Sequence, residues 1–236
     1  MLGYSHAMSG GVAWLALAPV IETTFGVQFE TYELLAGTIA TAGAALIPDL
    51  DHPQATIAHT FGPISKGVSK LTALLAGGHR QGTHSILFSL GFGALCYSIG
   101  IGSEASGSNL PAMILMFLLA AFAFRGLNIV PPKTSSSFKG IIVLLEAAAL
   151  TYVLSLMLEP GATWWWLGFA GAVGALTHLV GDAITPEGVP FFYPMKWRIS
   201  VPIIAHTGNI MERAIVSPLL TFALIYLAWQ TFAVGA

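Results

Sequence analysis

Seven long apolar runs, separated by short polar stretches, dominate the chain. They cover residues 7–21, 34–48, 84–101, 110–125, 140–158, 163–180 and 214–234. A helix needs about 20 apolar residues to cross the hydrocarbon core of a bilayer. The first two runs are shorter, and we expect them to be tilted or partly buried in protein. The pattern predicts an all-α, polytopic transmembrane helical bundle with about seven spans.

The polar stretch after the second run has a helical pattern of its own. Apolar residues recur there at alternating steps of four and three, at Ile57, Phe61, Ile64, Val68, Leu71 and Leu75. Lys66 and Lys70 fall on the other side of that helix. This pattern is typical of an amphipathic helix in the membrane interface, with its apolar stripe in lipid or against the bundle. Gly62 and Pro63 are expected to interrupt it near its start.

The composition excludes a water-soluble enzyme, a disordered chain and a coiled coil. The 236 residues are 55% apolar and 8% charged, and the mean hydropathy is +0.76. A soluble domain carries about a quarter charged residues. No repeat or low-complexity tract divides the chain, so residues 1–236 are expected to form a single integral membrane domain. The net charge of −2 argues against nucleic acid as a partner.

The nine basic residues occupy alternate predicted loops, three to a loop. They are Lys66, Lys70, Arg80, Arg125, Lys133, Lys139, Lys196, Arg198 and Arg213. The opposite loops carry glutamates and no basic residue. Cytoplasmic loops of membrane proteins carry an excess of Lys and Arg. We therefore expect a multi-pass protein of the plasma (inner) membrane, with its N-terminus in the cytoplasm and its C-terminus on the opposite side.

All seven histidines and all three aspartates fall on the same predicted side as the basic loops. They are His6, His52, His59, His79, His84, His178, His206, Asp49, Asp51 and Asp182. Histidines without a shared function would divide between the two sides. Imidazole and carboxylate groups are ligands of borderline and hard divalent metal ions. Their concentration at one face of the membrane predicts a metal site.

One acidic string ends the second apolar run, Pro48-Asp49-Leu50-Asp51-His52-Pro53. Acidic residues so close to an apolar span are costly unless they are paired or bind a metal. Two carboxylates and an imidazole within four residues can hold one metal ion or bridge two. The alternative is a helix end with a proline stop, where the carboxylates simply reach water.

A second string, His79-Arg80-Gln81-Gly82-Thr83-His84-Ser85, begins the third run. On one continuous helix, two histidines five residues apart point about 140° away from each other. They converge if Gly82 turns the chain and Thr83 caps the helix that follows. Arg80 is suited to anchoring a phosphate or carboxylate. The alternative is an interfacial histidine pair beside an arginine that reaches the membrane surface.

A third string, His178-Leu179-Val180-Gly181-Asp182, ends the sixth run. Because residues four apart share a helix face, His178 and Asp182 can share a metal ion or pair with each other. His6 opens the first run on the same side of the membrane. His206 and Glu212 lie in the last polar loop, where they can support a metal site without binding the ion.

Taken together, these strings resemble the YdjM-type proteins, a family of membrane-bound predicted metal-dependent hydrolases, some of them regulated by LexA. The resemblance rests on His6, on residues 47–53, on residues 79–85, and on His178 and Asp182 with the following Thr185, Pro186 and Gly188. It runs in order from residue 6 to about residue 213. Gln81 departs from the family pattern, where a small residue is expected. The resemblance implies a hydrolase with a metal site.

The residues and the resemblance lead to one working hypothesis, metal-assisted hydrolysis. The expected ligands of one or two divalent ions, Zn or Mn, are His6, Asp49, Asp51, His52, His79, His84, His178 and Asp182. Eight candidates exceed the need of one four-coordinate structural site, which favours an open catalytic centre. The metal would lower the pKa of a bound water, and Asp51 or Asp182 is expected to act as general base.

The substrate is expected to be a small amphiphile, because a site at this face opens at the level of the lipid headgroups. A phosphate ester of a lipid is the first candidate. Arg80, and less directly Lys196 and Arg198, are expected to hold its anionic group. Four further side chains are expected to support the ligands, Thr83, Thr185, His206 and Glu212.

Two other functions use the same ligands, a divalent-cation transporter and a non-catalytic membrane factor held together by metal. Transporters usually place their site near the middle of the bilayer, often between repeated halves. Here the candidate ligands gather at one face and no repeat is visible, which favours the enzyme.

Overall fold

The regular structure of the chain is helical. The computed structural model describes residues 1–130, 134, 136–158 and 161–234. The α-helices within these residues are α1 (Gly3–Phe25), α2 (Thr31–Ala44), α3 (Pro63–Ala76), α4 (Ile86–Ser106), α5 (Leu110–Leu127), α6 (Ser136–Met157), α7 (Leu167–Ala183) and α8 (Ser217–Trp229). The predicted all-α fold is confirmed, and Val189 and Ile199 form one isolated β-bridge.

Short helical turns extend or connect these helices. They are the 3-10 turns η1 (Ile47–Asp51), η2 (Thr56–His59) and η3 (Gly82–His84), and the π-helical turns η4 (Glu212–Val216) and η5 (Gln230–Val234). Two of them matter for the candidate site, because η1 continues α2 and η3 leads into α4.

Six stretches in the described part of the chain are long and apolar enough to cross a membrane. They are Gly3–Phe25, Thr31–Asp51, Ile86–Ser106, Leu110–Leu127, Phe138–Met157 and Glu212–Ala233. The shorter apolar helix α7 packs among α1, α2 and α4, which agrees with about seven spans. The expectation that the first two spans are short is wrong. The first has 23 residues and the second 21, because polar residues at their ends continue the helices.

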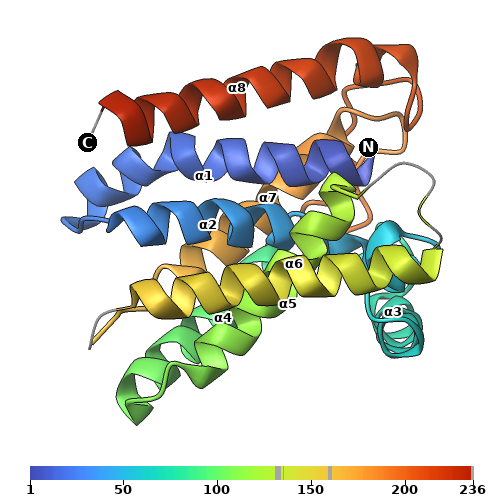
Figure 1. Cartoon of the computed structure of the whole chain (residues 1–236). Coiled ribbons are helices and arrows are strands. Elements are labelled where there is room, and N and C mark those ends of the chain that lie inside the picture. The colour runs from blue at the N-terminus through green and yellow to red at the C-terminus, as the bar shows by residue number, and fades with distance from the viewer. Residues whose placement is uncertain (131–133, 135, 159–160, 235–236) are drawn as a thin grey trace.

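The long helices lie side by side, and α1 and α8 begin at the same end of the bundle (Figure 1). Small residues let them approach closely, as is common between membrane helices. α2 buries a face of alanine and glycine and packs against α1, α5 and α7. A Cβ atom at Gly43 would overlap the backbone carbonyl of Leu119 in α5. This contact therefore depends on the glycine.

Replacing Gly43 by valine is expected to disrupt the bundle. The branched side chain would force α2 away from α5, and overpacking of this kind costs about 1–3 kcal/mol or more. Thermal unfolding in detergent, followed by circular dichroism, measures the loss. Gly91→Val in α4 is the matched control, because no described atom outside its chain neighbours and the backbone of its own helix lies within 4 Å of a Cβ there. Equal melting temperatures for the two variants would contradict the close contact.

α3 lies across the long axis of the bundle, since Figure 1 shows it almost end-on while the spans run across the view. It buries Ser65 and Ser69 against the bundle, and Ser65 Oγ donates a hydrogen bond to the Ala58 carbonyl (2.9 Å). Leu74 and Leu75 are 77% and 78% exposed. The predicted amphipathic helix is confirmed, and its apolar stripe faces away from the bundle. Pro63 begins the helix instead of interrupting it.

Candidate metal centre

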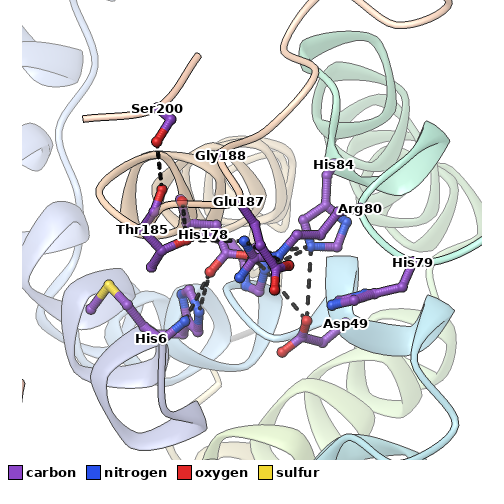
Figure 2. A network of polar contacts seen from close by, with 12 residues as sticks. His6, Asp49, His79, Arg80, His84, His178, Thr185, Glu187, Gly188 and Ser200 are labelled. Carbon is purple, nitrogen blue, oxygen red and sulfur yellow. Dashed lines mark hydrogen bonds and ion pairs between the residues drawn. The ribbon is translucent and has the colours of Figure 1, made fainter. Parts of the chain in front are cut away.

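Four segments that are distant in sequence meet at the end of the bundle where α1 begins (Figure 2). They are the start of α1, the turn η1 after α2, the loop between α3 and α4, and the last turn of α7. Together these segments contribute His6, Asp49, Asp51, His79, Arg80, His84, His178 and Asp182. Each segment begins, ends or connects helices, so polar groups gather here without interrupting an apolar span.

Four potential ligand atoms in this cluster face one another. They are Nε2 of His84, Nε2 of His178, Oδ1 of Asp49 and Oδ2 of Asp182. The two imidazole nitrogens are 3.2 Å apart, and the four nitrogen–oxygen distances between histidines and aspartates are 3.8, 3.6, 3.6 and 3.7 Å. A four-coordinate zinc ion with bonds of about 2.0–2.2 Å holds its ligands about 3.3–3.6 Å apart. We call these four residues the metal quartet.

The second ring nitrogen of each quartet histidine already has a partner. Nδ1 of His178 donates a hydrogen bond to the carbonyl of Ala45 (2.7 Å), and Nδ1 of His84 lies 3.2 Å from Oδ2 of Asp51. A proton on Nδ1 leaves the lone pair of Nε2 directed into the quartet. Metal-binding histidines generally use a carbonyl or a carboxylate in this way to fix the ring and its tautomer.

Asp51 lies behind His84, away from the quartet. Its side chain is buried, and it accepts hydrogen bonds from the Thr83 hydroxyl and from the backbone N–H of Arg80 (3.0 Å). Nδ1 of His79 lies 2.7 Å from the other carboxylate oxygen. Asp51 therefore orients two histidines at once. Asp49, Asp51, His79 and His84 also form a group whose atoms lie close enough to hold an ion.

Charge in the cluster favours cations, because the three carboxylates of Asp49, Asp51 and Asp182 are accompanied by two positive groups. These are the guanidinium of Arg80 and the N-terminal ammonium of Met1, which both lie 2.9 Å from Asp182. Burial alone lowers the pKa of His84, but the carboxylates of Asp182 and Asp51 outweigh this effect and raise that pKa to about 9. At neutral pH and without metal, the His84 ring is therefore protonated on both nitrogens and positively charged between Asp182 and Asp51. A divalent ion can take the place of this proton and neutralise more of the negative charge.

His6 is fully buried beside the quartet. Its ring stacks on His178 with a centroid distance of 3.8 Å, and its Nε2 lies 3.3 Å from Oδ1 of Asp182. A Cβ atom at Gly181 would lie 3.1 Å from the His6 ring, so the glycine makes room for it. Neither ring nitrogen of His6 makes a hydrogen bond with proper geometry in the described residues. Buried polar atoms are rarely left without partners, so this position fits an ion or a water molecule.

Arg80 turns into the cluster with a positive φ of 56°, which is uncommon for a residue with a side chain. Its Nη2 pairs with Asp182 (2.9 Å), and its Nη1 contacts Thr185 (3.0 Å) and Glu187 (3.4 Å). Its Nε is buried and has no partner among the described residues. Asp182 therefore lies between the arginine and the quartet histidines.

The predicted turn before α4 is wrong in its details. Arg80, and not Gly82, has the left-handed backbone, and Ser85, and not Thr83, caps α4 by accepting a hydrogen bond from the N–H of Phe88 (3.1 Å). The hydroxyl of Thr83 is used by Asp51 instead. His79 and His84 converge as expected, but through a different turn.

A cavity of about 270 Å³ adjoins the cluster. Its lining includes Asp49, His52, His79, Arg80, Asp182 and Thr207. The side chain of His79 is 33% exposed, whereas those of His84 and His178 are buried. The two quartet histidines are thus shielded from solvent, whereas the Asp49 side chain is 21% exposed toward the cavity. His79 lies at the boundary between cluster and cavity.

Other predicted site residues lie further out. His52 is half-buried beside His79, and its Nδ1 accepts a hydrogen bond from the backbone of Gln54 (3.1 Å). His206 and Lys196 are exposed. The guanidinium of Arg198 donates to the carbonyl of Arg80 (3.1 Å) and so supports the turn.

Two more predicted supporting residues are placed by hydrogen bonds. The hydroxyl of Thr185 donates to the Asp182 carbonyl (2.7 Å) and accepts from Arg80. Glu212 is buried and accepts from the backbone N–H groups of Leu2 (2.6 Å) and Gly208 (2.7 Å). It therefore ties the start of α1 to the start of α8.

The Ala45 carbonyl and Glu187 were not predicted as part of the site. A backbone carbonyl gives no sequence signal, whereas Glu187 adjoins a predicted turn.

Carboxylates at the opposite end of the bundle have structural partners. Glu33 accepts hydrogen bonds from the Thr163 hydroxyl (2.8 Å) and the Glu30 backbone (3.0 Å), and Glu104 accepts from the backbone of Trp164 and Trp165. Among the described residues, the two groups of His, Cys, Asp and Glu that are close enough to hold an ion both lie at the α1 end.

Comparison with known proteins gives one family and no solved structure. The sequence profile described as "YdjM inner membrane protein" matches residues 1–235. The chain is 24% identical to YvsG of Bacillus subtilis over 98% of its own length and 97% of that protein. It is 25% identical to the inner membrane protein YdjM of Escherichia coli over 80% of its length, which covers 63% of that relative. No solved structure matches significantly.

Proposed function

The chain belongs to the YdjM inner membrane protein family. We propose that it is a metal-dependent hydrolase. Its buried histidine–aspartate cluster would act on a small amphiphile at the membrane surface. The observation that carries the proposal is the metal quartet, in which four ligand atoms converge and both histidine tautomers are fixed by partners outside it. Multi-pass insertion in the inner membrane follows from the family and from the apolar helices.

The quartet His84, His178, Asp49 and Asp182 would hold the first divalent ion, either Zn or Mn. These metals accept mixed nitrogen and oxygen ligands. His6 would hold a second ion or a water molecule beside Oδ1 of Asp182, because its ring nitrogens are buried without hydrogen bonds. The same Oδ1 accepts from the N-terminal ammonium of Met1 (2.9 Å), which such an ion would displace. When bound, such an ion supplies Lewis acidity, which makes a water molecule a nucleophile at neutral pH.

His79 is our candidate for the group that moves the proton. Its Nδ1 is held by Asp51 at 2.7 Å, and its ring lines the cavity. In this arrangement His79 accepts a proton from the attacking water and returns it to the leaving alcohol, while Asp51 fixes the ring and stabilises its charged form. Asp51 would thus act through two histidines, and Asp182 would remain bound to Arg80 and the ion.

Arg80 would bind the anionic group of the substrate. Its contact with Glu187 is long, at 3.4 Å, and the Glu187 side chain is 73% exposed, so a phosphate or carboxylate can displace it. Arg80 also lines the cavity, and its Nε is buried without a partner among the described residues. Arg198 donates to the Arg80 carbonyl, and neither Lys196 nor Arg198 lines the cavity, which leaves Arg80 as the main anchor. A lipid phosphate ester remains our first candidate for the substrate.

The ligands lie at one end of the bundle, which favours hydrolysis over transport, since transporters bind their ions near the middle of the membrane.

The direct test of hydrolysis incubates purified, metal-loaded protein with lipid phosphate esters and acyl esters, with and without a chelator. His79→Gln is expected to keep its metal and lose about 100-fold in turnover, the usual contribution of general acid–base catalysis.

His59→Gln is the matched control for this test, because His59 is half-buried and outside the cavity lining. It is expected to retain the wild-type rate. If the metal-loaded protein hydrolyses no ester in either class, the hydrolase proposal is wrong and the metal ties helix ends together.

The cluster is expected to face the cytoplasm. The basic residues Lys66, Lys70, Arg80, Lys196 and Arg198 lie at this end of the bundle, and positive charge is retained on the cytoplasmic side. Alkaline phosphatase fused after the last helix should therefore be active in the periplasm, and a fluorescent protein at the same point should be dark. The opposite pair of results would place the cluster outside the cell.

A further inference from the structure

Two segments beside the cluster turn apolar side chains outward. In α3 these are Ile64, Val68, Leu71, Leu74 and Leu75, and in residues 189–203 they are Phe192, Met195, Trp197, Ile199, Val201 and Ile203. Each of them is between 45% and 78% exposed. A monomer in water rarely exposes so much contiguous apolar surface. These residues therefore need an apolar partner.

The two segments form one surface. Residues 189–203 begin with a hairpin in which the backbones of Val189 and Ile199 exchange two hydrogen bonds (3.1 and 3.0 Å). The Tyr193 side chain of this hairpin would lie within 3.7 Å of a Cβ atom at Gly77 or Gly82. The hairpin thus contacts the loop that follows α3. The N–H of Ile86 also donates to the carbonyl of Phe191 (2.9 Å). We call α3 and residues 189–203 the docking surface.

The docking surface carries positive charge and no acidic residue. Lys66, Lys70, Lys196 and Arg198 belong to it, and there is no Asp or Glu in residues 60–80 or 189–203. The aspartates at this end of the bundle, Asp49, Asp51 and Asp182, belong to the cluster. The exposed Glu187, two residues before the hairpin, contacts Arg80 (3.4 Å). Trp197, with 74% of its surface exposed, is of the residue type that concentrates at membrane–water interfaces.

The orientation of α3 matches the plane of a membrane. α3 crosses the axis of the spanning helices at one end of the bundle (Figure 1), which is the position of a helix embedded in the interface. We propose that the docking surface inserts its apolar side chains into the bilayer around the protein and binds anionic lipid headgroups through its lysines. The partner is therefore the anionic membrane surface itself.

This surface borders the cavity. His79 and Arg80, which line the cavity, lie between Gly77 and Gly82, the two glycines next to Tyr193. Arg198 connects the hairpin to the same loop through the carbonyl of Arg80. Docking therefore holds the mouth of the cavity at the level of the headgroups. The inference does not depend on the proposed hydrolase activity, because only the surface and its lipid partner enter it.

The test uses the full-length protein in lipid nanodiscs made of phosphatidylcholine and phosphatidylglycerol. The only cysteine, the buried Cys96, is replaced by alanine, and single spin labels are attached through Trp197→Cys or Leu74→Cys. Leu145→Cys in α6 is the lipid-facing reference, and Ser108→Cys between α4 and α5 is the water-facing one. Oxygen and a charged nickel chelate then report whether each label lies in lipid or in water.

Labels at 197 and 74 are expected to match the lipid-facing reference, with high exposure to oxygen and low exposure to the chelate. Chelate exposure equal to that at 108 would overturn the proposal. Strong spin–spin broadening between two copies labelled at 197 would also overturn it, because the apolar partner would then be protein.

The charge is tested separately with spin-labelled lipids. The wild-type protein is expected to immobilise phosphatidylglycerol in preference to phosphatidylcholine, and the variant Lys66→Gln/Lys70→Gln/Lys196→Gln should lose most of this preference. Added salt should weaken the preference of the wild type in the same direction. An unchanged preference in the triple variant would contradict the assignment to anionic headgroups.

Discussion

His178→Ala is expected to remove tightly bound metal from the purified protein. The substitution deletes one of four converging ligand atoms and leaves His84 as the one quartet nitrogen that faces the carboxylates of Asp49 and Asp182. It also removes the ring that stacks on His6. Because the site is buried, water cannot easily replace the imidazole. We expect the affinity for zinc to fall by more than about 100-fold, beyond the effect of losing an outer partner.

Competition with a chelator of known affinity measures this change. His206→Ala is the matched control, because His206 lies in the same half of the chain but is exposed and outside the cluster. Its affinity for metal should equal that of the wild type. Circular dichroism in detergent shows whether His178→Ala remains folded. A folded variant that binds zinc as tightly as the wild type would exclude His178 as a ligand.

Asp51→Asn is expected to weaken metal binding without abolishing it. The asparagine keeps the size of the side chain but replaces one carboxylate oxygen by an NH2 group, which donates and does not accept. Because His79 faces Oδ1 and His84 faces Oδ2 of Asp51, one of the two histidines loses its acceptor. Substituting such an outer partner usually costs 10- to 100-fold in metal affinity or activity, about 1.4–2.7 kcal/mol. The rate of hydrolysis should fall further, since His79 loses the group that fixes its ring.

Comparing Asp49→Asn with Asp51→Asn distinguishes a metal ligand from a residue that only positions the ligands. Asp49 contributes an oxygen within 3.8 Å of both quartet histidines, so its loss should resemble that of His178 and lower the amount of metal bound at saturation. Asp51→Asn should still bind the full amount at higher metal concentration. If the two variants show the same loss, Asp51 is itself a ligand and not a positioning residue.

The transmembrane architecture could be predicted from the sequence because membrane insertion imposes simple rules. A spanning helix must be long and apolar, and charged residues must lie at its ends. These rules alone predict that Arg80 and Lys196 lie at the same end of the bundle. The true ends of the first two spans could not be predicted, since polar residues such as Thr31 join a helix when their hydrogen bonds are satisfied locally.

Most members of the cluster could also be predicted, although the predicted ligand His52 lies outside it. The roles within the cluster could not be predicted. The spacing of His178 and Asp182 places both on one face of a helix, and the side of the membrane brings Asp49 and His84 toward them. Whether an aspartate meets the ion or holds a histidine depends on ring orientations. These are set by groups without a sequence signal, such as the Ala45 carbonyl and the left-handed backbone of Arg80.

The most direct test of the account is the metal content of the wild-type protein. The full-length chain is purified in detergent without chelator, incubated with zinc or manganese, freed of loosely bound ions and subjected to elemental analysis. We expect about one or two divalent ions per folded chain, the content of an open catalytic centre. A folded chain that retains neither metal would contradict it.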